Sequence, residues 1–156
     1  MKNWFYKNFI TLGPIGYLPA SGTLATLCTL PIAYALRSTI DSWLIYCIII
    51  ILLMLFSWHA IYTVFNRFKL FNRFTSQDPR EIVIDEVVGT LITFSFVQPT
   101  LVNVIVGFIL FRFFDISKFP FIYLLEKRGN ALAIILDDCA AGVLSAVLLY
   151  MLQQLL

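Results

Sequence analysis

Long apolar runs, separated by short polar stretches, dominate this sequence. In the clearest run, residues 43–65, no polar residue except Tyr46 precedes Ser57. About 20 consecutive apolar residues are enough for a helix to cross the ~30 Å hydrocarbon core of a bilayer. We therefore predict that this segment is a membrane-spanning helix.

Four further apolar segments accompany it. They cover residues 23–36, 82–97, 101–114 and 131–156. Pro31 lies inside the first of these segments and predicts a kink. The Gln98-Pro99-Thr100 sequence predicts a turn between the second and the third.

We interpret these segments as helices because a membrane protein has lipid, not water, around its apolar segments. In lipid, backbone polar groups must be satisfied within a helix or a closed barrel, and the segments lack the alternation of barrel strands. We expect an all-α, membrane-embedded bundle of about four to five helices, formed by residues 1–156 as a single domain. Gly89 and Gly142, inside apolar segments, predict close helix packing. The pattern leaves open whether 23–36 and 82–97 span the membrane fully.

The composition agrees with a membrane protein. Apolar residues make up 60% of the chain and charged residues 13%, against about half and a quarter in typical globular proteins. The mean hydropathy is +0.89. The formal net charge of +2 is small, and no basic stripe of the kind that nucleic-acid-binding proteins carry is present. We expect membrane lipid as a partner, no nucleic acid, and no protein partner.

The lysines and arginines predict an orientation. Basic residues are frequent at the N-terminus and in the segments 66–81 and 112–130, and sparse at the other segment ends, where Arg37 stands alone. Because cytoplasmic loops of membrane proteins carry the excess of Lys and Arg, we predict a multi-pass protein with these three regions in the cytoplasm.

Five carboxylates then fall on the predicted cytoplasmic side, at three separate helix ends. They are Asp85, Glu86, Asp115, Asp137 and Asp138. Grouped carboxylates repel each other without a counter-charge, intramembrane acids are costly, and Mg²⁺ takes oxygen ligands and bridges substrate phosphates. We predict a Mg²⁺ site formed by these acids at the cytoplasmic face. The alternative is a set of solvated acids at ordinary helix ends.

Two cations close to Asp115 are candidates for binding phosphate. Arg112 and Lys118 are spaced three residues to either side of Asp115. Arginine binds phosphate in bidentate fashion and lysine acts as a point charge. An interfacial anchor with an ion pair inside the helix explains the same spacing equally well.

A glycine-containing stretch, Gly13–Thr23, directly precedes a predicted helix. Backbone amides at a helix N-terminus suit an anion, so Gly22 and Thr23 are further phosphate-binding candidates. An ordinary capped turn is the alternative.

Four sequence blocks together resemble the phosphatidylglycerophosphatase A family. They are Gly16–Thr23, Ile82–Gly89, Leu110–Lys118 and Leu136–Gly142. The resemblance extends from Gly13 to about Tyr150. It implies an all-helical, Mg²⁺-dependent phosphatase of the bacterial inner membrane, with phosphatidylglycerophosphate as substrate and phosphatidylglycerol and phosphate as products.

The chain departs from the family pattern in four places, one of which is a long loop between His59 and Asp85. Ser21 and Phe119 stand where the family has proline, and the stretch before Asp137 contains less glycine than the family pattern. All charged residues of the motifs are intact, so these changes concern the shape of the phosphate-side loops more than the reaction.

Our mechanistic hypothesis is metal-assisted hydrolysis. The five acids supply or orient Mg²⁺ ligands, Arg112 and Lys118 neutralise phosphate charge, and water activated by the metal attacks phosphorus. Asp85, Glu86 and Asp115 are the catalytic candidates, with Asp85 as a candidate base. An aspartyl-phosphate route, the number of Mg²⁺ ions, head-group specificity and oligomeric state stay open.

Two alternative functions remain at this point. A small ion-coupled transporter would also contain intramembrane carboxylates, but these acids gather at one face, and no inverted repeat is evident. The other alternative is a phosphatase of a different lipid phosphate, which the sequence discriminates poorly.

Overall fold

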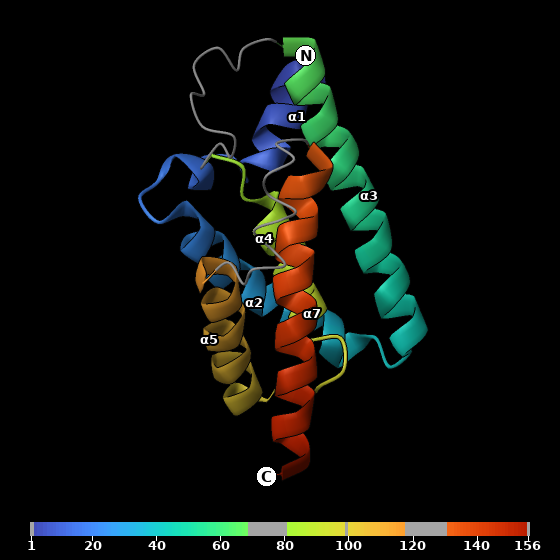
Figure 1. Cartoon of the computed structure of the whole chain (residues 1–156). Coiled ribbons are helices and arrows are strands. Elements are labelled where there is room, and N and C mark those ends of the chain that lie inside the picture. Colours follow the sequence, from blue (N-terminus) through green and yellow to red (C-terminus); the bar gives the residue numbers. More distant parts are fainter. Residues whose placement is uncertain (1, 69–80, 99, 118–130, 156) are drawn as a thin grey trace.

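A computed structural model of the chain describes residues 2–68, 81–98, 100–117 and 131–155. Within these ranges the chain is all-helical, with six α-helices, one short 3₁₀ helix and no strand (Figure 1). The elements are α1 (Lys2–Ile10), η1 (Ile15–Tyr17), α2 (Ser21–Thr39), α3 (Trp43–Phe68), α4 (Ile84–Thr93), α5 (Leu101–Ser117) and α7 (Ala131–Leu155). The predicted all-α class is confirmed, and α1 comes in addition to the predicted apolar segments.

The long helix α7 runs through the middle of the bundle, with α3 on one side and α5 on the other (Figure 1). The short helix α4 packs chiefly against α7, α2 packs chiefly against α4, and α5 packs against α7. Helix α1 lies along one end of α3. As a result, α4 is the most enclosed element, and most of its side chains are buried.

The contact between α4 and α7 is a backbone contact made through two glycines. A Cβ atom on Gly142 would lie 2.5 Å from the backbone oxygen of Gly89. A Cβ atom on Gly89 would lie 2.6 Å from the backbone oxygen of Asp138 and 2.6 Å from the ring of Phe111. Small residues allow helices to approach this closely, so the predicted close packing at both glycines is confirmed.

The other interfaces of the bundle are filled by larger side chains. Tyr46, Phe94, Phe111 and Ile61 are among the largest fully buried residues. Helix α2 continues through Pro31 to Thr39 without interruption. Because proline lacks the amide hydrogen, the helix has one backbone hydrogen bond fewer at this point.

Two of the described helices are long and apolar enough to cross a membrane: Trp43–Val64 within α3 and Ala131–Leu155, which is α7. Only 28% of the apolar window in α3 is buried inside the protein, and large side chains such as Leu44, Ile48 and Leu52 point outward. Helix α4 has 10 residues, about 15 Å, which is too short for a ~30 Å core.

Candidate active site

The first turn of α4 carries two acids into the interior. Asp85 and Glu86 begin this helix, and Asp85 is only 7% exposed. The amide of Glu86 donates a hydrogen bond to Oδ1 of Asp85 at 3.2 Å. These two carboxyl groups therefore occupy the positive end of α4, where negative charge is favourable.

Asp138 of α7 completes a group of three acids. Asp138 is 5% exposed, and one carboxylate oxygen from each of Asp85, Glu86 and Asp138 lies within 4.8 Å of the others. Oxygen-only ligand sets of this kind are typical of sites for hard divalent cations such as Mg²⁺. The arrangement is compatible with a single shared cation.

The close crossing of α4 and α7 explains why these particular acids meet. Asp85 precedes Gly89 by four residues, and Asp138 precedes Gly142 by four residues. Residues four apart lie on the same face of a helix. Both acids therefore extend along the faces on which the two glycines bring α4 and α7 into contact.

The end of α5 brings a cation and a fourth acid to the group. Nη1 of Arg112 lies 2.6 Å from Oδ2 of Asp115, in an ion pair whose side chains are 16% and 19% exposed. The charge of Asp115 acts on Glu86, and a side-chain hydrogen bond joins Asp115 to Asp138. Asp115 therefore lies beside the three-acid group and links it to Arg112.

The start of α2 covers the same place from another side. A Cβ atom on Gly22 would collide with Oε1 of Glu86 and would lie 3.3 Å from Nη1 of Arg112. Any larger residue at this position would force the Glu86 carboxylate to move. Helix α2 has Ala20 as its N-cap, with a positive φ of 56° and no side-chain cap, and the first amides of a helix have no partner within it.

Glu86 and Arg112 each contain a buried polar atom without a hydrogen-bond partner among the described residues. These atoms are Oε2 of Glu86 and Nε of Arg112. Buried polar atoms in native proteins are usually paired, and an exception often marks a ligand or ion site. The two atoms belong to side chains of opposite charge, so they suit a cation and an anion respectively.

Burial raises the pKa of Glu86 to about 7, and the charge of Asp115 adds to this effect. The hydrogen bond with Asp85 and the charge of Arg112 act in the opposite direction. Each further positive charge near Glu86 would favour its ionised form. A bound divalent cation would therefore relieve the repulsion within this group.

The predicted site residues divide into three sets. Asp85, Glu86 and Asp138 come together, with Asp115, Arg112 and Gly22 in contact with them or beside them. Asp137 is half-buried next to Asp138, and Thr23 lies half-buried in the first turn of α2. Lys118 and Phe119 lie outside the described residues, as do most of the basic residues of segments 66–81 and 112–130.

The sequence pattern did not distinguish Asp138 from its neighbour Asp137. Adjacent helical residues point about 100° apart, so only one of the two can extend along the α4-facing side. The four-residue interval to Gly142 was the available signal. The role of Gly22 as a contact of Glu86 and Arg112 had no signal of this kind, because it depends on how α2 packs.

Comparisons with known proteins identify the family of this chain. The model of a family described as phosphatidylglycerophosphatase A matches residues 8–153, a range that contains all four motif blocks. A phosphatidylglycerophosphatase A from Haemophilus influenzae is 38% identical over 78 residues. That match covers 49% of this chain and 48% of the relative, so the chain spans about half the length of this protein. No solved structure matches significantly. The family match extends over nearly the whole chain, and the chain therefore belongs to the phosphatidylglycerophosphatase A family.

Proposed function

We propose that this protein is a Mg²⁺-dependent phosphatase that hydrolyses phosphatidylglycerophosphate to phosphatidylglycerol and phosphate. The observation that carries this proposal is the meeting of three carboxylates, Asp85, Glu86 and Asp138, beside the guanidinium of Arg112. Membership of the family and the name of the Haemophilus influenzae relative supply the substrate.

The three acids fit a Mg²⁺ ion. All their donors are oxygens, the oxygens are mutually close, and Oε2 of Glu86 is buried without a hydrogen-bond partner among the described residues. Asp85, Glu86 and Asp138 would hold the ion, and Asp115 and Asp137 would orient its other ligands. When bound, Mg²⁺ supplies charge neutralisation for the phosphate and lowers the pKa of a coordinated water.

Arg112 is the proposed phosphate-binding group. Its Nη1 pairs with Asp115, which fixes the direction of the guanidinium, while Nε is without a hydrogen-bond partner among the described residues. Planar guanidinium groups suit phosphate oxygens. The first amides of α2 at Gly22 and Thr23 lie on the same side and would donate to the same anion. Lys118 stays a proposed second cation.

The attacking water requires a proton acceptor, and Asp85, Glu86 and Asp115 are the candidates. Asp85 and Glu86 belong to the three-acid group, and burial raises the pKa of Glu86, whereas Asp115 is bound to Arg112 in an ion pair. A carboxylate close to the phosphate can act as a general base. Trapping of phosphate on the protein in a hydroxylamine-sensitive form would instead indicate an aspartyl-phosphate route.

We propose further that the protein lies in the bacterial inner membrane as a multi-pass protein with its site facing the cytoplasm. The two candidate spans and the distribution of lysines and arginines support this orientation. Trp43, Phe96 and Tyr150 form a chain of ring contacts, with centroids 6.0 and 6.4 Å apart, and such aromatic groups favour membrane–water interfaces. They would mark the opposite, periplasmic interface.

The decisive experiment measures phosphate release from phosphatidylglycerophosphate in detergent micelles, with Mg²⁺ or with EDTA. Wild-type protein should release phosphate only with Mg²⁺, and Asp85→Asn should be inactive. Asp41→Asn is the matched control, because Asp41 is an exposed acid at the other end of the bundle. Absence of release from folded wild type, or full activity of Asp85→Asn, would refute the proposal.

A further inference from the structure

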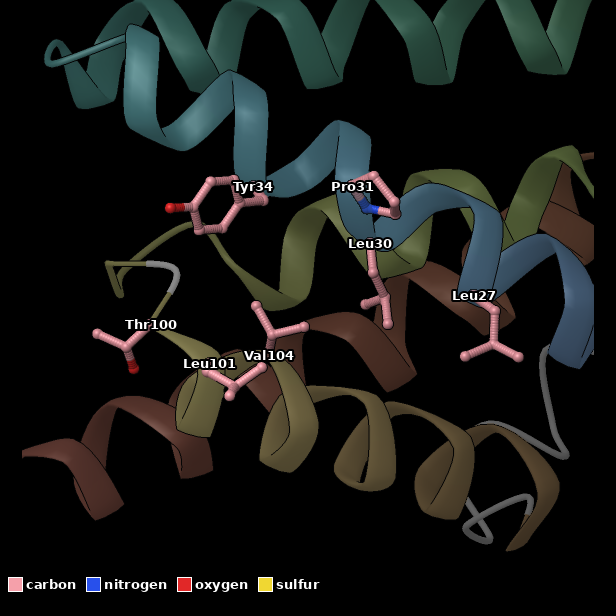
Figure 2. Close-up of a pocket in the computed structure, with 7 residues that line it drawn as sticks. All are labelled: Leu27, Leu30, Pro31, Tyr34, Thr100, Leu101 and Val104. Atoms are coloured by element: carbon pink, nitrogen blue, oxygen red, sulfur yellow. The ribbon is translucent and has the colours of Figure 1, made fainter.

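An apolar groove lies between α2 and α5 (Figure 2). Leu27, Leu30 and Tyr34 line it from α2, and Leu101 and Val104 line it from the start of α5. Its volume is ≈550 Å³, within the ~300–1,000 Å³ range of ligand pockets. Nothing in the reaction proposed above uses this space.

The packing of the bundle explains why the groove is open. Helix α2 is packed chiefly on α4, and α5 is packed chiefly on α7, so the two helices are held by different partners. Figure 2 shows the side chains of Leu27 and Leu30 directed from α2 toward α5, with Val104 directed back from α5. Side chains of this size keep the two backbones apart, in contrast to the glycine contact between α4 and α7.

The groove lies between the same two helices whose other ends meet at the active site. Gly22, at the start of α2, lies against Arg112, near the end of α5, and the two helices run in opposite directions (Figure 2). Leu27 and Tyr34 follow Gly22 by five and twelve residues, or roughly 7 and 18 Å along a helix. The groove therefore begins a few ångströms beyond the Gly22–Arg112 contact and extends away from the phosphate-binding guanidinium along the middle of α2.

The groove is also open along its side. Tyr34 is 52% exposed and Leu101 is 76% exposed. A ligand that fits this shape is long, unbranched and apolar, and it carries its charge at the end near Arg112. One acyl chain of a phospholipid whose phosphate is bound at Arg112 has these properties, because the chain extends away from the phosphate.

We propose that the groove between α2 and α5 is an acyl-chain subsite, which holds one fatty acyl chain of the phospholipid substrate while Arg112 binds its phosphate. The inference rests on the proposed function and adds to it a means of distinguishing lipid substrates from water-soluble phosphate monoesters. The subsite also predicts that side chains along the groove set a preference for chain length.

The test compares phosphatidylglycerophosphate with six-carbon and sixteen-carbon acyl chains in Mg²⁺-containing micelles. Val104→Trp should block the part of the groove distant from Arg112. We expect it to raise KM for the sixteen-carbon substrate about tenfold or more, from lost contact with a few methylene groups, without changing kcat or the values for the six-carbon substrate. Leu27→Trp, nearer to Arg112, should raise KM for both substrates.

The matched control is Val102→Trp. Val102 lies on the same helix and is 58% exposed, but it does not line the groove. This variant should behave as wild type with both substrates. Unchanged turnover of the six-carbon substrate by Val104→Trp shows that the variant is folded.

Three results would overturn the subsite. They are equal effects of Val104→Trp on both chain lengths, no effect on either, and the same chain-length effect from Val102→Trp, which would indicate contact with bulk lipid. If wild type releases no phosphate from either substrate, the proposed function itself fails, and the subsite falls with it.

Discussion

Two arginines near opposite ends of α2 have very different surroundings. Arg37 is 8% exposed, and it donates from Nε to the backbone oxygen of Val97 and from Nη1 to that of Ile40. Its guanidinium also lies 5.1 Å from the ring centroid of Tyr46. Arg112, beside Gly22, is paired with Asp115 but has a buried Nε without a partner among the described residues.

We interpret this difference as that between a structural arginine, Arg37, and an arginine proposed to bind the substrate, Arg112. The protein itself supplies partners for Arg37, and the Tyr46 hydroxyl donates in turn to the backbone oxygen of Leu91. A buried polar group without a partner is costly. Nε of Arg112 and Oε2 of Glu86, which have no hydrogen-bond partner in the described part of the chain, are therefore expected where ligands of opposite charge bind.

The largest expected effect separates the two adjacent acids of α7. Asp138→Asn should lower kcat roughly 10²–10³-fold, as for loss of a group that stabilises charge at the reacting centre. Asp137→Asn, outside the three-acid group, should lower it about tenfold, as for an outer partner of a metal site. Phosphate release at saturating Mg²⁺ measures both, and equal losses would contradict the assignment.

Replacement of each arginine by methionine tests the comparison directly. Arg112→Met should reduce kcat/KM about 100-fold through loss of the phosphate contact, with little change in thermal unfolding. Arg37→Met should leave activity nearly unchanged but destabilise the fold by about 1–3 kcal/mol, because the backbone oxygens of Val97 and Ile40 lose their donor. Activity assays should therefore show the larger loss for Arg112→Met, and unfolding in detergent should show the larger loss for Arg37→Met. A variant that loses activity and stability in parallel would refute the distinction between the two arginines.

A methyl group at the crossing of α4 and α7 should weaken the metal site without removing a ligand. In Gly142→Ala the new Cβ would press on Gly89, and overpacking of this kind costs about 1–3 kcal/mol. We expect the Mg²⁺ concentration for half-maximal activity to rise roughly tenfold. Ala140→Gly, on the same helix, is the control for a general loss of stability in α7, because glycine costs about 1 kcal/mol relative to alanine inside a helix. An equal effect there would contradict a role for the crossing.

The smallest expected effect is a pH dependence. Because burial raises the pKa of Glu86 from 4.5 to about 7, protons compete with Mg²⁺ below pH 7, and apparent Mg²⁺ affinity should fall as pH falls from 8 to 6. In the absence of metal, the stability of the folded state has the opposite pH dependence: it is higher at low pH. The folded state holds the Glu86 proton that the unfolded state releases, so stability decreases as pH rises from 4.5 to 7.

Mg²⁺ titrations of activity and metal-free unfolding curves at several pH values measure these two trends. Glu86→Gln should flatten the stability trend, because the group no longer titrates. A stability that increases with pH between 4.5 and 7 in wild type but not in Glu86→Gln would show that the pKa of Glu86 is lowered instead.

Much of the fold followed from the apolar pattern. The long segment 43–65 corresponds to α3, because in lipid a long apolar segment satisfies its backbone polar groups as a helix. The turn predicted at Gln98 lies between α4 and α5. Helix α1 was missed, since its residues mix lysine and asparagine with aromatic side chains. The left-handed residues Leu12 and Ala20 also had no signal, because such conformations are expected of glycine.

The sequence by itself determined the family, the helical class and which acids and cations lie near predicted helix ends, because residue types and spacing record these directly. Only the tertiary structure decided which acids meet. Asp85, Glu86 and Asp138 come together because Gly89 and Gly142 allow the backbones of α4 and α7 to touch. Gly22 meets Arg112 because α2 packs against both α4 and α5. The groove beside them likewise depends on which helices hold α2 and α5. Periodicity gives the faces of a helix, but the partner of each face is set by packing between segments distant in the chain.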